Sequence, residues 1–138
     1  MKIEEPILFL PGPVTLPSNV NKVISSPIIG HRTEEFHKVF THVISMLKKI
    51  FMTKDGKIFL LTSSGTGGVE ASIINCFSPG DRVIVPIYGA FSRRASNIMK
   101  RLGIKTVDLN LPTGEGPETE FIRQKIIEYS DVKGIFIV

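Results

Sequence analysis

The spacing of apolar and polar positions changes once along the chain, near residue 57. Before this point, apolar residues recur at three- and four-residue steps from Phe36 to Phe51, as on one face of an amphipathic helix. Thr33 precedes this segment as a candidate cap, and acidic residues at its start suit the helix dipole. The pattern predicts a long helix that begins after Thr33 and is terminated by residues 54–56.

After residue 57, short apolar runs alternate with longer mixed segments. The continuous apolar run at 58–61 is typical of a strand covered on both faces. Strands are expected at residues 58–61, 82–85, 105–109 and 134–138, and helices at 66–77, 90–102 and 118–129. This alternation predicts an α/β fold with a mostly parallel, doubly wound sheet.

The first 32 residues have a different pattern. Their early prolines, such as Pro11 and Pro13, disfavour helix and predict an extended arm. A short helix is expected from Pro17 to about Ser25, with Ser18 as its N-cap. We therefore divide the chain into residues 1–32, an N-terminal arm with a short helix, and residues 33–138.

Composition excludes several function classes. The chain has 138 residues, of which 42% are hydrophobic and 22% charged, as in ordinary globular proteins. The net charge of +4 comes from scattered basic residues, so we expect no nucleic-acid partner. No apolar stretch approaches the ~18 residues that span a bilayer, so we expect no membrane partner either.

The cysteine and histidine residues bear on the cellular compartment and on whether the chain binds a metal. The single cysteine, Cys76, cannot form an internal disulfide and fits a reducing compartment. Its apolar neighbours predict a buried thiol. The N-terminus does not look like a signal peptide, so we expect a cytoplasmic protein. His37 and His42 would lie on different faces of the long helix, so no metal site is expected.

A glycine-rich turn, Ser63 to Gly68, lies between the first expected strand and the next helix. Backbone amides, hydroxyls and the positive end of a helix favour an anion there. A P-loop is not supported because no lysine follows the glycines. A dinucleotide site is not supported because Glu70 occupies the third small position of that motif. A small phosphate monoester, such as that of pyridoxal phosphate, and a plain strand–helix turn both remain open.

An aromatic residue that could cover the ring of such a ligand follows the second expected strand. Phe91 lies beyond the carboxyl end of that strand, at the sheet edge where the glycine-rich turn is also expected. It could equally belong to the core.

Four short runs, in this order and spacing, make the chain resemble the class V aminotransferases. They are 8–13 (LFLPGP), 27–32 (PIIGHR), 64–67 (SGTG) and 78–83 (SPGDRV). The resemblance extends over essentially the whole chain and is strongest to the serine–pyruvate and alanine–glyoxylate branch. It implies a homodimeric pyridoxal-phosphate enzyme of fold type I, in which residues 33–138 form the first part of the cofactor-binding large domain.

The resemblance also implies roles for individual residues. The residues implied to hold the cofactor phosphate are Ser64, Gly65, Thr66 and Gly67. Phe91 falls where the family stacks an aromatic ring on the pyridine ring. Gly30 and His31 fall where the family brings an N-terminal segment close to the substrate. The implied reaction moves an amino group from serine or alanine to pyruvate or glyoxylate.

The residues that carry the family's chemistry are not found in this chain. The Schiff-base lysine, the aspartate for the pyridine nitrogen and the arginine for the substrate carboxylate come later in the family. The chain ends inside an apolar strand at Val138. We therefore expect the front part of an enzyme, inactive by itself. The alternatives are aminoethylphosphonate transamination, cysteine desulfuration or a non-catalytic binding module.

Overall fold

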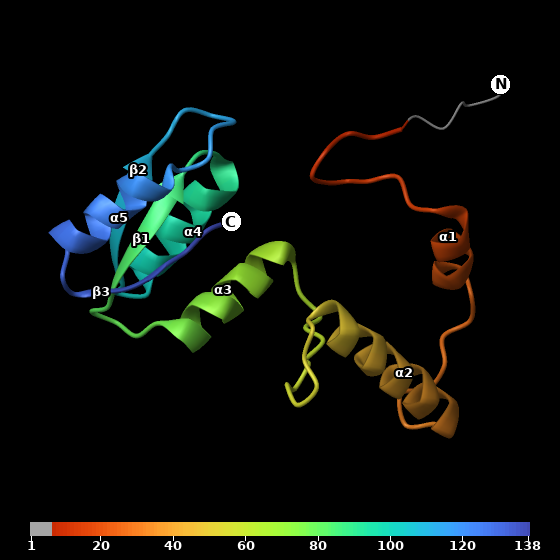
Figure 1. Ribbon diagram of the computed structural model, residues 1–138. Coiled ribbons are helices and arrows are strands. Elements are labelled where there is room, and N and C mark those ends of the chain that lie inside the picture. The colour runs from red at the N-terminus through yellow and green to blue at the C-terminus, as the bar shows by residue number, and fades with distance from the viewer. Residues whose placement is uncertain (1–6) are drawn as a thin grey trace. The chain divides into compact units, whose positions relative to one another are not determined.

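The computed structural model describes residues 7–138, which fall into two compact units (Figure 1). The first unit ends at Phe59, and the second runs from Leu60 to Val138. Each unit is described by itself. The expected division after residue 32 stays a prediction.

The first unit contains helices α1 (Ser18–Ile24) and α2 (Glu34–Ile50). Helix α2 begins where its capping pattern predicts, because the Thr33 hydroxyl accepts a hydrogen bond from the backbone N–H of Phe36 at 3.2 Å. The start of α1 was wrongly predicted: Pro17 occupies the N-cap, Ser18 is already helical, and no side chain caps the helix. Pro17 has the extended backbone of an N-cap (φ −58°, ψ 145°). No helix among residues 7–138 has the length and apolar character required to cross a lipid bilayer.

The second unit has an α/β fold, and its parallel sheet has the strand order β2-β1-β3 (Figure 1). Its elements are α3 (Gly65–Cys76), β1 (Arg82–Ile87), α4 (Ala90–Arg101), β2 (Lys105–Asn110), α5 (Thr119–Glu128) and β3 (Val132–Ile135). The chain moves from β1 to β2 and then crosses back to the other side of β1. Since such crossovers are right-handed, this reversal puts α4 and α5 on opposite faces of the sheet. The predicted α/β class with a parallel, doubly wound sheet is confirmed.

Two sequence predictions about residues 58–76 are wrong. Residues 58–61 form no strand, and the exposed fraction of the Phe59 side chain is 77%. A strand needs a neighbour to hydrogen-bond with, and the sheet of the described residues consists of β1, β2 and β3 only. Cys76 is exposed rather than buried, because it lies at the end of α3 and away from the core cluster.

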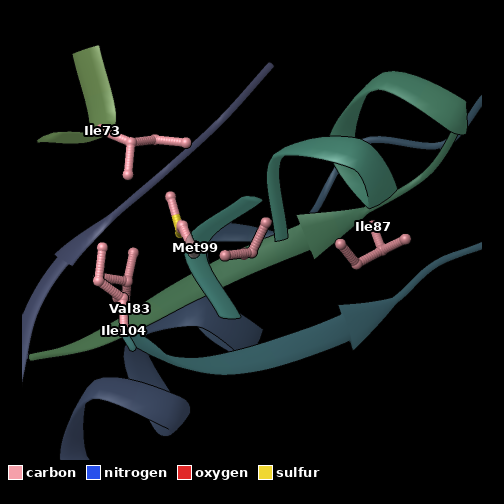
Figure 2. Close-up of a cluster of buried hydrophobic side chains, with 6 residues drawn as sticks. Ile73, Val83, Ile87, Met99 and Ile104 are labelled. Carbon is pink, nitrogen blue, oxygen red and sulfur yellow. The ribbon is translucent and has the colours of Figure 1, made fainter. Parts of the chain in front are cut away.

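The core of the second unit lies between one face of β1 and the helices α3 and α4. Its buried side chains, shown in Figure 2, are Ile73, Val83, Val85, Ile87, Met99 and Ile104. The three from β1 alternate along the strand and so share a face, whereas Ile84 is buried on the other face. Because α3 and α4 contribute to one cluster, they pack side by side on the same face of the sheet, and this packing positions the site.

Candidate phosphate-binding site

The glycine-rich turn forms the beginning of helix α3. Ser64 is the N-cap, and its hydroxyl oxygen accepts a hydrogen bond from the backbone N–H of Gly67 at 3.2 Å. The backbone N–H groups of Gly65 and Thr66 lie in the first turn, where helix geometry provides no acceptor four residues earlier. The turn therefore presents amide donors and hydroxyls at the positive end of a helix, a combination that binds anions.

The glycines of the turn differ in the room around them. A methyl group at Gly67 would lie 1.9 Å from the Ser63 hydroxyl oxygen, so a side chain there requires Ser63 to move. At Gly65 and Gly68, no atom of the described residues outside the chain neighbours and the local helix backbone lies within 4 Å of an added methyl group. A side chain at Gly67 thus displaces the Ser63 hydroxyl, while Gly65 leaves its outer side open to a ligand.

The start of helix α4 is held by a buried serine. The Ser92 hydroxyl accepts hydrogen bonds from the backbone N–H groups of Tyr88 (3.1 Å) and Gly89 (3.2 Å), and donates to the Gly89 carbonyl at 3.0 Å. Ser92 is only 2% exposed. These bonds fix the turn between β1 and α4, and with it the residue before Ser92, Phe91.

Phe91 is not a core residue of the second unit. Its side chain is 52% exposed, which argues against the interpretation of Phe91 as a core residue. A half-exposed phenyl ring on the first turn of α4 can cover a flat ligand. Stacking on the pyridine ring itself stays a prediction.

Arg94 connects Thr66 to Phe91. Its Nη1 donates a hydrogen bond to the Thr66 hydroxyl oxygen at 3.1 Å, and its guanidinium carbon lies 5.6 Å from the centre of the Phe91 ring. The second contact is within the range of a cation–π interaction. Thr66 and Arg94, but not Phe91, also border a groove of about 560 Å³ between the start of α3 and the length of α4, lined by Thr66, Glu70, Ala90, Arg93, Arg94, Asn97, Ile98 and Arg101.

Arg94 is absent from the residues that the sequence identifies as a site. The sequence does indicate that Arg94 lies beside Phe91, because the two are three positions apart on one helix and such residues are neighbours on the helix surface. What the sequence does not indicate is its contact with Thr66, which lies 28 residues earlier.

An anionic residue of β2 holds helix α4 in place. The Asp108 carboxylate accepts hydrogen bonds from Ser96 Oγ (2.7 Å), Lys100 Nζ (2.7 Å) and Arg93 Nη1 (3.3 Å). Arg93 also donates to the side chain of Asn110. Partial burial acts to raise the pKa of Asp108, but hydrogen bonds, chiefly from Lys100 and Ser96, outweigh it and lower this pKa below its ordinary value of 3.8. Helix α4 is therefore fixed on β2 by an ionised carboxylate.

Gly30 and His31, the expected substrate residues, lie in the first unit. The Gly30 carbonyl accepts hydrogen bonds from the backbone N–H of Thr33 (3.0 Å) and from its hydroxyl (2.8 Å). These bonds form the turn that leads into α2. His31 is exposed. Their contact with a substrate stays a prediction.

Several of the known proteins that are similar to this chain are aminotransferases. No protein-family model matches it. An uncharacterized aminotransferase of Methanocaldococcus jannaschii is 33% identical over 100% of this chain and 36% of its own length. The L-aspartate–glyoxylate aminotransferase of Paracoccus denitrificans is 36% identical over 84% of this chain and 29% of its own length. The serine–glyoxylate aminotransferase of Hyphomicrobium methylovorum is 36% identical over 83% of this chain and 28% of its own length.

Solved structures agree with these relatives. The crystal structure of ureidoglycine–glyoxylate aminotransferase from Bacillus subtilis matches with a TM-score of 0.82 and 26% identity, over 99% of this chain and 36% of that one. The chain thus spans about a third of the length of the curated relatives that it matches.

Proposed function

The chain belongs, by homology along its length, to the class V aminotransferases of the serine- and alanine–glyoxylate type, and we propose that it supplies the phosphate-binding part of a pyridoxal-phosphate transaminase. The proposal rests on the agreement between the sequence relatives and the geometry of the turn around Ser64. Relatives with this activity match the chain over most of its length, and the turn around Ser64 has the donors that a phosphate group requires.

The residues present fit pyridoxal phosphate at two separate points. The phosphate needs several hydrogen-bond donors and positive charge, which the first turn of α3, the Thr66 hydroxyl and the Arg94 guanidinium offer together. The pyridine ring needs a flat apolar cover, which the half-exposed Phe91 offers. In this proposal Ser64, Gly65, Thr66 and Gly67 bind the phosphate, and Phe91 stacks on the ring.

Each part of the chain contributes to binding and orientation. When bound, pyridoxal phosphate supplies an electron-withdrawing ring that stabilises negative charge at the substrate Cα. The α3 turn fixes one end of the cofactor, and Phe91 excludes water from one face of the ring and limits its tilt. Gly30 and His31 are proposed to approach the substrate.

The substrates that we propose are a small amino acid as donor and glyoxylate as acceptor. Three of the proteins named above are glyoxylate aminotransferases by name, and their amino donors differ, being aspartate, serine and ureidoglycine. Serine and alanine are the donors expected from the sequence resemblance. Cysteine desulfuration and aminoethylphosphonate transamination are not favoured by these relatives.

We also propose a cytoplasmic homodimer. The homodimer follows from the family resemblance, and the cytoplasmic location from the single cysteine, which fits a reducing compartment.

The test is an assay of the full-length protein that carries this chain. We expect the purified protein to show the visible absorption of bound pyridoxal phosphate, and to convert glyoxylate to glycine with serine, alanine or aspartate as donor. Pyruvate in place of glyoxylate tests the acceptor, and a reaction without amino donor is the control. A protein that holds no cofactor, or that holds it and transfers no amino group to glyoxylate from any of these donors, would contradict the proposal.

A further inference from the structure

We propose that Arg94 is a positioning residue, which directs the Thr66 hydroxyl at the cofactor phosphate and holds Phe91 over the cofactor ring. The inference rests on the proposed function. It concerns a residue that contacts both candidate ends of the site, the α3 turn and the aromatic cover on α4.

The first step concerns the hydrogen of the Thr66 hydroxyl. A hydroxyl group has one hydrogen to donate and two lone pairs that accept. Because Arg94 Nη1 donates to the Thr66 oxygen at 3.1 Å, one lone pair is engaged and the hydroxyl hydrogen points away from the guanidinium. Thr66 is the second residue of α3, so a phosphate oxygen at this helix end would accept that hydrogen together with the first-turn amides.

The second step concerns the Phe91 ring. An exposed phenyl side chain loses rotamer freedom when it is fixed against a ligand, and this loss weakens binding. The guanidinium of Arg94 lies 5.6 Å from the ring centre, so part of this restriction exists before the ligand arrives. The ring and the phosphate turn are thus held by one side chain.

The third step concerns what holds Arg94. Its helix is fixed at the start by the buried Ser92 and along its length by the Asp108 carboxylate, which binds Arg93, Ser96 and Lys100. These contacts fix the direction in which Arg94 leaves α4. They also engage the neighbouring Arg93, so Arg94 is the member of the pair that reaches Thr66.

The experiment measures cofactor binding by the full-length protein with Arg94→Gln, and compares it with Thr66→Val and the double variant. The control is Arg123→Gln, since Arg123 is an exposed arginine on α5 that pairs with Glu120. We expect Arg94→Gln to weaken pyridoxal-phosphate binding about tenfold to a hundredfold, because the Thr66 hydroxyl then no longer directs one charge-assisted hydrogen bond at the phosphate. Arg123→Gln should leave binding unchanged.

Two further readouts separate positioning from folding. In the Thr66→Val background, Arg94→Gln should have a clearly smaller effect than in the wild type, because the group through which it acts is missing. The ³¹P resonance of the bound cofactor should shift in the Arg94 and Thr66 variants and not in the Arg123 variant. Arg94→Lys, which keeps the charge and a donor, should recover part of the affinity.

The outcomes are distinguishable. Equal cofactor affinity of wild type and Arg94→Gln would overturn this inference and leave the proposed function standing. Fully additive effects of Arg94→Gln and Thr66→Val would show that Arg94 does not act through Thr66, and would overturn it too. A wild-type protein that binds no pyridoxal phosphate would overturn the proposed function and this inference together.

Discussion

Replacing Asp108 by Asn tests whether one carboxylate holds helix α4 on the sheet. Asn keeps the shape of Asp and can still accept the hydrogen bond from Ser96. Its amide nitrogen, however, cannot accept from Lys100 or Arg93, so the substitution removes two ion pairs of 2.7 and 3.3 Å. We therefore expect a lower free energy of unfolding and an unchanged fold.

The size of the effect follows from exposure. A buried ion pair that loses one partner costs about 3–5 kcal/mol, whereas exposed pairs contribute about 0.2–1 kcal/mol each. The side chain of Asp108 is 15% exposed, but those of Lys100 and Arg93 are 49% and 47% exposed. Solvent screens both cations, so we expect a loss of about 1–2 kcal/mol, nearer to the exposed limit.

The pH dependence gives a second, independent signature. The pKa of Asp108 is lower in the folded than in the unfolded protein, so the unfolded state binds the proton more readily as pH falls. The stabilisation is fully present above the ordinary value of 3.8 and is lost as pH falls through the lower folded pKa. The difference between wild type and Asp108→Asn should hence be constant from about pH 7 to pH 5 and shrink below about pH 4.

The assay is denaturant unfolding of the purified protein, followed by circular dichroism at pH 7, 5 and 3. Glu115→Gln, which removes an exposed carboxylate from the loop between β2 and α5, is the matched control for the change in net charge. Equal stability of wild type and Asp108→Asn at pH 7 would refute the reasoning. So would a difference that persists unchanged at pH 3.

Three further substitutions test the core, the turn and the aromatic cover. Met99→Ala removes a fully buried side chain and should lower the free energy of unfolding by about 2–5 kcal/mol in denaturant titrations; a loss below 1 kcal/mol would argue against the described core. Gly68→Ala lies within α3 with open space around it, so it should raise the free energy of unfolding by about 0.5–1 kcal/mol. Gly67→Ala should give no such gain, because its methyl group meets Ser63. Equal gains for the two variants would contradict the geometry of the turn. Phe91→Leu should change stability by less than about 1 kcal/mol, because the ring is half exposed, and should weaken cofactor binding in absorbance titrations; the reverse result would make Phe91 a packing residue.

Features set by short-range chemistry were predictable from the sequence. Helix α2 starts after Thr33 because a hydroxyl there bonds an amide three residues on, and both groups are close along the chain. Strand β1 and helix α4 likewise lie where their apolar spacing predicts them. The cap at Ser64 obeys the same local rule, although the helix was expected to begin at residue 66 and no cap was predicted there.

Features set by partners distant along the chain were not predictable. Residues 58–61 have the composition of a strand, but composition does not supply the neighbour that a strand needs. Arg94 lies 28 residues from Thr66, and only the packing of α3 beside α4 brings them together. For the same reason, no spacing rule indicates that Asp108 gathers three side chains of α4.

The strand order β2-β1-β3 means that one edge of β1 lacks its partner strand for part of the time that the chain is being synthesised. Ile84 of β1 pairs with Val107 of β2 on one side and with Ile135 of β3 on the other. At about 5–20 residues per second, the 28 residues from Val107 to Ile135 (135 − 107) take roughly 1–6 s to synthesise. During this interval β1 has a partner on only one edge, and its other edge is open to pairing with any strand nearby. One edge of the central strand is therefore open to mispairing until β3 emerges, and slower translation across residues 107–135 would lengthen that exposure.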